Sequence, residues 1–184
     1  MLTTKQLKQD IQLYFGSRGE IRKHRTGFFS DLNNPERLGL FFCVQSKHEL
    51  DQVRFLLSKI GKERNNTQAI VFFQGSGSLD VVTHKSIFMF SLDDFNLFGK
   101  KKEPLQLKFE KERYDLLISF TFQPQPFCKK LVSEIHADFK IGPDHEDGEA
   151  LYDMLISVSD QALGFSSYYD EVVRYLGMLN VRNG

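Results

Sequence analysis

Tryptophan is absent from this chain, and among its 184 residues cysteine occurs twice and proline five times. The cysteines, Cys43 and Cys128, are far apart in the sequence, so they form neither the clustered ligand set of a zinc site nor a C-x-x-C redox motif. Each lies in an apolar stretch, where a free cysteine usually serves as a packing residue. The sequence therefore predicts that both cysteines are buried and reduced.

Long apolar runs are also missing. No stretch reaches the roughly 18 apolar residues that a membrane-spanning helix needs, so no membrane association is expected. Residues 1–15 are polar and lack the apolar segment of a secretory signal. A cytoplasmic location is the default expectation.

Neither sign of charge dominates, because 24 Lys and Arg residues balance 24 Asp and Glu residues. Hydrophobic residues make up 41% and charged residues 26%, which is ordinary for a soluble globular protein. A chain of this length can bury a core without a disulfide or metal, and it favours a single domain.

The balanced total hides an uneven distribution. Residues 1–25 are mainly basic, and residues 134–171 are strongly acidic. A basic N-terminal arm could bind phosphate, as in nucleic acid, or the acidic surface of a protein partner. The alternative interpretation of the basic residues is a solvated helix face followed by a loop, with no binding role. Of the two possible partners, a protein is preferred to nucleic acid.

Apolar periodicity predicts the elements. Residues 1–35 are expected to form an amphipathic helix, at 3–15, and an irregular arm, whereas 36–184 form a single α/β domain. Continuous apolar runs predict buried strands, and helical spacing predicts the helices between them. The strands are expected at 38–44, 69–73, 87–90, 116–120, 139–141 and 153–158, and the main helices after Ser46, after Pro124 and after a cap at Ser167–Asp170. This alternation indicates a three-layer, Rossmann-like α/β sandwich with a mainly parallel sheet of five or six strands.

Motifs for catalysis or cofactor binding are absent. Gly75-Ser-Gly77 follows a strand, but Asp80 stands where a dinucleotide-binding loop needs its third glycine. The sequence contains no Walker A loop, no G-x-S-x-G string and no helical pair of metal-binding histidines. No cofactor, metal or catalytic residue is predicted, which favours a non-catalytic role without excluding an enzyme.

Two groups of polar residues are the candidates for binding. The first follows the strands, where ligands of open α/β sheets usually bind; its members are Gln74, Ser76 and Gln123. The second forms a basic turn, in which Asn96 and Gly99 would shape the backbone and the lysines would meet acidic groups; its lysines are Lys100 and Lys101. A solvated turn is the alternative for this second group.

Phenylalanine is abundant, with 18 residues. Many of them lie in or beside the predicted strands, which indicates a thick aromatic core rather than a surface for stacking bases; these are Phe41, Phe42, Phe72, Phe73, Phe88, Phe90, Phe120 and Phe122. Phe95, Phe98, Phe127 and Phe165 lie outside the strands, and any exposed aromatic site is expected among these four.

Four strings carry a resemblance. They are Asp-Phe-Asn-Leu-Phe-Gly-Lys at 94–100, Tyr-Asp-Leu-Leu-Ile at 114–118, Ala-Asp-Phe-Lys-Ile-Gly at 137–142 and Tyr-Asp-Met-Leu-Ile at 152–156. Through their order and spacing the chain resembles, over roughly residues 36–180, a family of short bacterial α/β proteins of unknown function. Residues 114–142 are also similar to the N-terminal domain of heptosyltransferase-type glycosyltransferases. That similarity implies a Rossmann-like half without the second, nucleotide-sugar-binding domain, so it supports the fold rather than the activity. Ser119 stands where the family more often has Asp, which puts a carboxylate role there in doubt.

The two Tyr-Asp pairs each precede a predicted strand. Asp115 and Asp153 are expected to accept hydrogen bonds from backbone N–H groups at the strand entrance, and Tyr114 and Tyr152 to cover the sheet.

Taken together, the sequence favours a non-catalytic protein that binds another macromolecule through the turn at 96–102. The alternatives are a small enzyme or sensor that binds a nucleotide or sugar phosphate at the strand C-termini, and an RNA-binding protein that uses the basic arm. The oligomeric state is not predicted.

Overall fold

The structure is a computed structural model that describes residues 32, 34–61, 64, 66–75, 85–123, 125–145, 148–157 and 164–181. Three predictions lie outside these residues: the helix at 3–15, the basic arm of residues 1–25, and the placement of Ser76.

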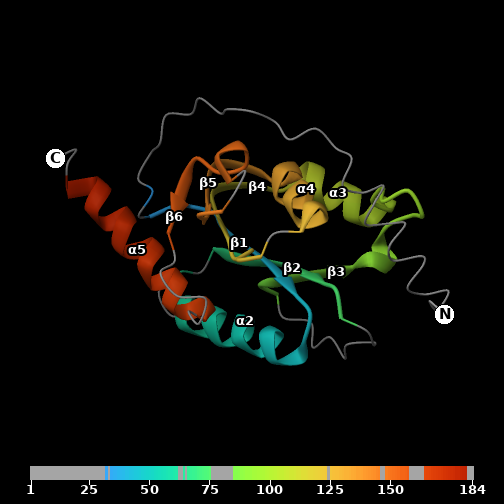
Figure 1. The fold of residues 1–184 in the computed structure, drawn as a ribbon, viewed down its shortest axis with the longest axis horizontal. Coiled ribbons are helices and arrows are strands. Elements are labelled where there is room, and N and C mark those ends of the chain that lie inside the picture. The colour runs from blue at the N-terminus through green and yellow to red at the C-terminus, as the bar shows by residue number, and fades with distance from the viewer. Residues whose placement is uncertain are drawn as a thin grey trace.

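A six-stranded parallel sheet forms the middle layer of the fold (Figure 1). Its strands are β1 (Leu38–Val44), β2 (Thr67–Phe73), β3 (Ile87–Ser91), β4 (Arg113–Ser119), β5 (His136–Pro143) and β6 (Met154–Ile156). They lie in the order β3-β2-β1-β4-β5-β6, so the direction of winding reverses between β1 and β4. This is the strand order of a doubly wound, Rossmann-like sheet, and the predicted fold class is confirmed.

Four helices cover the two faces of the sheet. Helices α2 (Lys47–Ile60) and α5 (Phe165–Val181) pack on one face, and α3 (Glu103–Lys111) and α4 (Pro126–Glu134) on the other (Figure 1). Two short 3-10 helices, η1 (Leu92–Asp94) and η2 (Gly148–Ala150), complete the described elements. Each helical layer buries one side of the parallel strands, which explains why the strands are apolar on both faces.

Helix α2 begins as its sequence predicts. The Ser46 side chain accepts from the Glu49 backbone N–H at 3.2 Å, and the Glu49 carboxylate accepts from the Ser46 N–H at 3.3 Å. This reciprocal capping box satisfies two donors that a helix start leaves free.

Two helices differ from the prediction. Helix α3 was not predicted, because only Leu105 and Phe109 of its nine residues are buried and its apolar stripe is therefore weak. Helix α5 begins at Phe165 rather than after a cap at Ser167–Asp170, since Phe165 is itself part of the core. Tyr175 and Leu179 of this helix are exposed, although they share its helical spacing with the buried Val172 and Leu176.

The phenylalanines form two aromatic cores, one on each face of the sheet, as the sequence predicts. On the α2/α5 face, Phe42 stacks on Phe120 with ring centroids 4.4 Å apart, and Phe165 packs edge-on against Phe42 at 5.1 Å. On the other face, Phe72 contacts the rings of Phe90, Phe95 and Phe127.

Of the four phenylalanines expected to include any exposed aromatic site, Phe98 alone is exposed. Phe95, Phe127 and Phe165 are buried. Phe55 on α2, which the sequence did not single out, is as exposed as Phe98.

The Tyr-Asp pairs serve the packing role that was predicted. The Asp115 carboxylate accepts from the Arg37 N–H at 2.9 Å, and the Asp153 carboxylate accepts from the Lys140 N–H at 2.7 Å. Both tyrosine rings are buried against a glycine of the neighbouring strand, Tyr114 against Gly39 and Tyr152 against Gly142.

The prediction of two reduced cysteines is wrong. Cys43 near the end of β1 and Cys128 in the first turn of α4 form a disulfide. Cys128 is buried, whereas Cys43 is half-buried. The sequence did not predict this disulfide, because the pairing depends on β1 and β4 being neighbours in the sheet, and no local sequence pattern indicates that arrangement.

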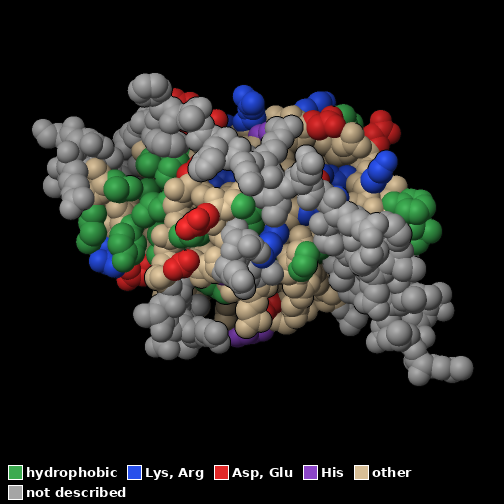
Figure 2. All heavy atoms as spheres, turned by 45° about the horizontal axis from the view of Figure 1, so that its top comes forward, with side chains coloured by type: hydrophobic (Ala, Val, Ile, Leu, Met, Phe, Trp, Pro, Cys, Tyr) green, Lys and Arg blue, Asp and Glu red, His purple; other side chains and the backbone are tan. Residues whose placement is uncertain are grey.

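The surface includes an apolar area on the outer side of α5. Figure 2 shows hydrophobic side chains gathered at the end of the molecule where α5 projects in Figure 1. The exposed members on this helix are Val173, Tyr175, Met178 and Leu179. Among the described residues, no helix is both long and apolar enough to span a membrane.

Candidate functional site

A tight turn at 96–101 connects η1 to α3 and forms one wall of the candidate site. The Asn96 side-chain oxygen accepts from the backbone N–H groups of Phe98, at 2.9 Å, and Lys100, at 3.0 Å. The Asn96 N–H donates to the Lys100 carbonyl at 2.9 Å, and the Gly99 N–H donates to the Asn96 carbonyl at 3.0 Å. Gly99 has φ of 70°, a left-handed conformation that favours glycine. Asn96 and Gly99 therefore shape the backbone of this turn.

The turn presents apolar and basic side chains at its tip. Leu97 is 54% exposed and Phe98 is 64% exposed. Lys100 is exposed as well, and its ammonium group forms no ion pair with the part of the chain that the structure describes. Hydrophobic and basic side chains stand out at the corresponding end of the molecule in Figure 2. Large apolar groups on a fixed turn are the kind of feature that protein interfaces bury.

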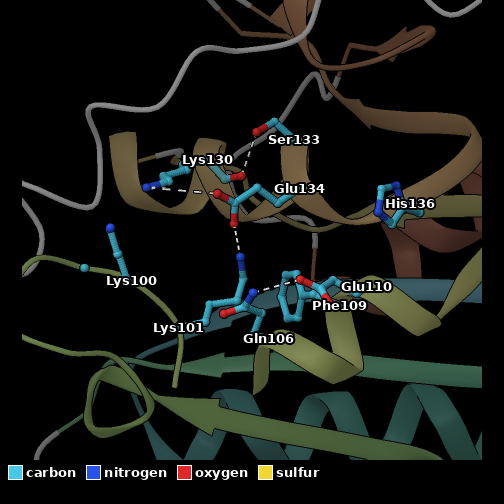
Figure 3. A pocket seen from close by; sticks show the side chains of 10 residues that line it. Lys100, Lys101, Gln106, Phe109, Glu110, Lys130, Ser133, Glu134 and His136 are labelled. Atoms are coloured by element: carbon cyan, nitrogen blue, oxygen red, sulfur yellow. Dashed lines mark hydrogen bonds and ion pairs between the residues drawn. The ribbon is translucent and has the colours of Figure 1, made fainter. Parts of the chain in front are cut away.

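A pocket of about 390 Å³ lies between this turn, α3 and α4. The turn contributes Gly99, Lys100 and Lys101, and the remaining lining residues come from α3, α4 and the start of β5 (Figure 3). These are Gln106, Phe109, Glu110, Lys130, Ser133, Glu134 and His136.

Glu134 is the central charged group of the pocket. Figure 3 shows its carboxylate between the ammonium groups of Lys101, with which it is ion-paired, and Lys130, which lies 4.0 Å away. Lys101 also lies over the ring of Phe109, 4.6 Å from its centroid. A protein carboxylate thus already occupies a position between two lysines of the pocket.

The predicted site residues fall into two separate places. Gly99, Lys100 and Lys101 line the pocket and Asn96 holds their turn, but Gln74 and Gln123 lie elsewhere. Gln123 is exposed beyond the end of β4.

Gln74 lies at the carboxyl edge of the sheet, just after β2. Its side chain accepts from the Gln45 amide at 3.4 Å and donates to the Gln125 carbonyl oxygen at 3.1 Å. Three neutral amides are therefore linked across β2, β1 and α4, and their polar groups are engaged with one another.

Sequence reasoning missed the contribution of α3 and α4 to the pocket. Phe109 belongs to the helix that was not predicted, and Lys130 and Glu134 lie on α4. The i, i+4 spacing of Lys130 and Glu134 was the one available signal, since such pairs face each other on a helix. It did not show which other segment would approach that helix face.

The polar residues at the end of β4 are buried in a hydroxyl cluster. The Ser119 and Thr121 hydroxyls lie 2.8 Å apart, and the Tyr152 hydroxyl is 3.0 Å from each of them. Burial raises the pKa of Tyr152, so its phenol stays protonated at neutral pH. Ser119 is thus part of a buried, hydrogen-bonded cluster.

Metal binding has no support within the described ranges. No group of three or more His, Cys, Asp or Glu residues there is arranged to hold an ion.

The strand order and the two helical layers define a doubly wound α/β protein, with a lysine-lined pocket on its α3/α4 face. The chain belongs to a family of unknown function, DUF6913, whose model matches residues 11–179. No curated protein and no solved structure matches the chain. The resemblance to a family of unknown function is thereby confirmed, whereas the similarity to heptosyltransferases stays a prediction.

Proposed function

We propose that this chain is a non-catalytic protein that binds a protein partner through the 96–101 turn and the adjoining pocket. The observation that carries the proposal is the exposure of Phe98 on a turn held by four hydrogen bonds, next to Lys100, which forms no ion pair with the residues that the structure describes. Because the turn is already ordered, binding would cost little conformational entropy.

The partner chemistry follows from these side chains. Phe98 and Leu97 would enter an apolar depression, and Lys100 at the mouth of the pocket would face a carboxylate of the partner. An aromatic anchor surrounded by polar contacts is the usual composition of an interface hot spot. The neighbouring Lys101 is held by Glu134 and would contribute less.

Replacement of Phe98 by alanine is expected to weaken binding at least tenfold, as hot-spot truncations do. Stability should change by no more than about 0.5 kcal/mol, because the side chain is mostly exposed. The measurement is capture of partners from native lysate at low salt with quantitative mass spectrometry, followed by titration of the captured protein. Phe55→Ala is the matched control, because Phe55 is 65% exposed on α2, a helix on the opposite face. A partner that binds wild type and the Phe98→Ala variant equally would contradict the proposal.

The alternative function is supported by the strand order alone. Winding reverses between β1 and β4, and open α/β sheets usually bind nucleotides outside the carboxyl ends at such a point. The amides of Gln45, Gln74 and Gln125 at this edge are linked to one another. A rise in melting temperature with a nucleotide or sugar nucleotide would favour this alternative.

A further inference from the structure

The Cys43–Cys128 disulfide lies at the carboxyl edge of the sheet, apart from the pocket residues. It joins the penultimate residue of β1 to the first turn of α4. We propose that this pair is a reversible thiol–disulfide exchange site, reduced by an external thiol that attacks Cys43 and displaces Cys128 as a thiolate. The proposal is independent of the protein-binding function proposed above.

The two cysteine residues differ in exposure. Cys43 is half-buried, whereas Cys128 is 2% exposed. Exchange requires an approach to one sulfur while the other departs, so access directs the attack to Cys43.

The surroundings of Cys128 suit a leaving thiolate. The residue is the third of α4, and the position before the helix, Gln125, makes no side-chain capping bond. Cys128 thus lies in the first turn, at the positive end of the helix dipole, and such positions lower the pKa of a cysteine thiol.

A second group acts on the same sulfur. The Gln74 side-chain N–H donates to Cys128 Sγ at 3.7 Å, and the same amide is held in place by Gln125 at 3.1 Å. This donor comes from the end of β2, a different element from α4. Its hydrogen bond would strengthen as negative charge develops on the sulfur, because bonds to charged acceptors are the stronger ones.

The exchange is balanced with a thiol reductant. The external thiolate forms a bond to Cys43 Sγ, the Cys43–Cys128 bond breaks, and its electron pair remains on Cys128. A second external thiolate then attacks the mixed disulfide and releases Cys43, so that two thiols are oxidised to one disulfide and the protein disulfide is reduced to two thiols. Both cysteines sit on regular elements, which keeps them close for reoxidation.

The first test locates the attack. The native protein is treated with glutathione, quenched with acid, and mapped by mass spectrometry after proteolysis. The expected product carries glutathione on Cys43. An adduct on Cys128, or a disulfide that is reduced only after the protein is unfolded, would overturn the proposal.

The second test compares the two thiols one at a time. In Cys43→Ser the remaining thiol is Cys128, and in Cys128→Ser it is Cys43, so the thiolate ultraviolet absorbance of each variant titrates one residue. Cys128 is expected to titrate at least about one pH unit below Cys43, and below the ordinary value of about 8.5. Adding Gln74→Leu to Cys43→Ser is expected to move the Cys128 midpoint upward. Equal midpoints, or a midpoint that Gln74→Leu leaves unchanged, would refute the thiolate role assigned to Cys128 and Gln74. Circular dichroism confirms that each variant is folded.

Discussion

Replacement of Phe42 by alanine is expected to lower the free energy of unfolding by about 3–5 kcal/mol, the usual cost of removing a fully buried phenylalanine. Phe42 has no exposed surface and lies in the middle of β1. Its ring contacts those of Phe120 and Phe165, which come from the β4 end and from α5. The substitution therefore leaves a cavity at the point where three elements meet, and rigid strands cannot collapse to fill it.

Chemical denaturation with a two-state fit measures this loss, and the melting temperature should fall by roughly 10 °C for a chain of this length. Phe98→Ala is the control, because the same atoms are removed from an exposed turn and a change within about 0.5 kcal/mol is expected. A Phe42→Ala variant as stable as Phe98→Ala would show that the α2/α5 core is not packed as described.

Replacement of Gly142 by alanine is expected to cost about 3 kcal/mol through overpacking. A Cβ atom at this position of β5 would lie 2.3 Å from the ring of Tyr152, far inside contact distance. The ring cannot move aside cheaply, because it is buried and its hydroxyl is bonded to Ser119 and Thr121 at 3.0 Å. The loss is measured by the same denaturation experiment.

Gly177→Ala provides the matched control for this second change. Gly177 lies in α5, and a Cβ there would meet nothing within 4 Å. Alanine favours a helix by up to about 1 kcal/mol over glycine, so this variant should be slightly more stable than wild type. Destabilisation by Gly177→Ala, or tolerance of Gly142→Ala, would contradict the contacts described for these two glycines.

The layered fold could be predicted because its signals are local. The apolar run at 38–44 and the capping box at Ser46 and Glu49 lie next to each other in the sequence and specify a strand followed by a helix. Helix α3 escaped prediction for the same reason, since two buried residues in nine make a weak periodic signal. The start of α5 was misplaced because Phe165, which packs on Phe42, already lies within the helix.

The candidate site could be predicted in part. The turn at 96–101 was recognisable from Asn96, Gly99 and its lysines, because the residue types that favour a turn lie close together in the sequence. The opposite wall of the pocket comes from α4, and nothing near the turn in sequence points to Glu134 as the partner of Lys101. The pocket is therefore a product of how α3 and α4 pack on the sheet.

By itself the sequence determined the class of fold and the aromatic core, because the burial pattern is encoded within a few residues. It also indicated the packing role of the Tyr-Asp pairs, because each pair precedes an apolar run, but not that their partners are Arg37 and Lys140. Only the tertiary structure decided that Cys43 and Cys128 are bonded, that Gln74 reaches Cys128, and that Lys101 meets Glu134. Each of these contacts joins segments brought together by the strand order, which places β1 beside β4. Local sequence patterns do not predict the strand order, because that order is set by the packing of the whole sheet.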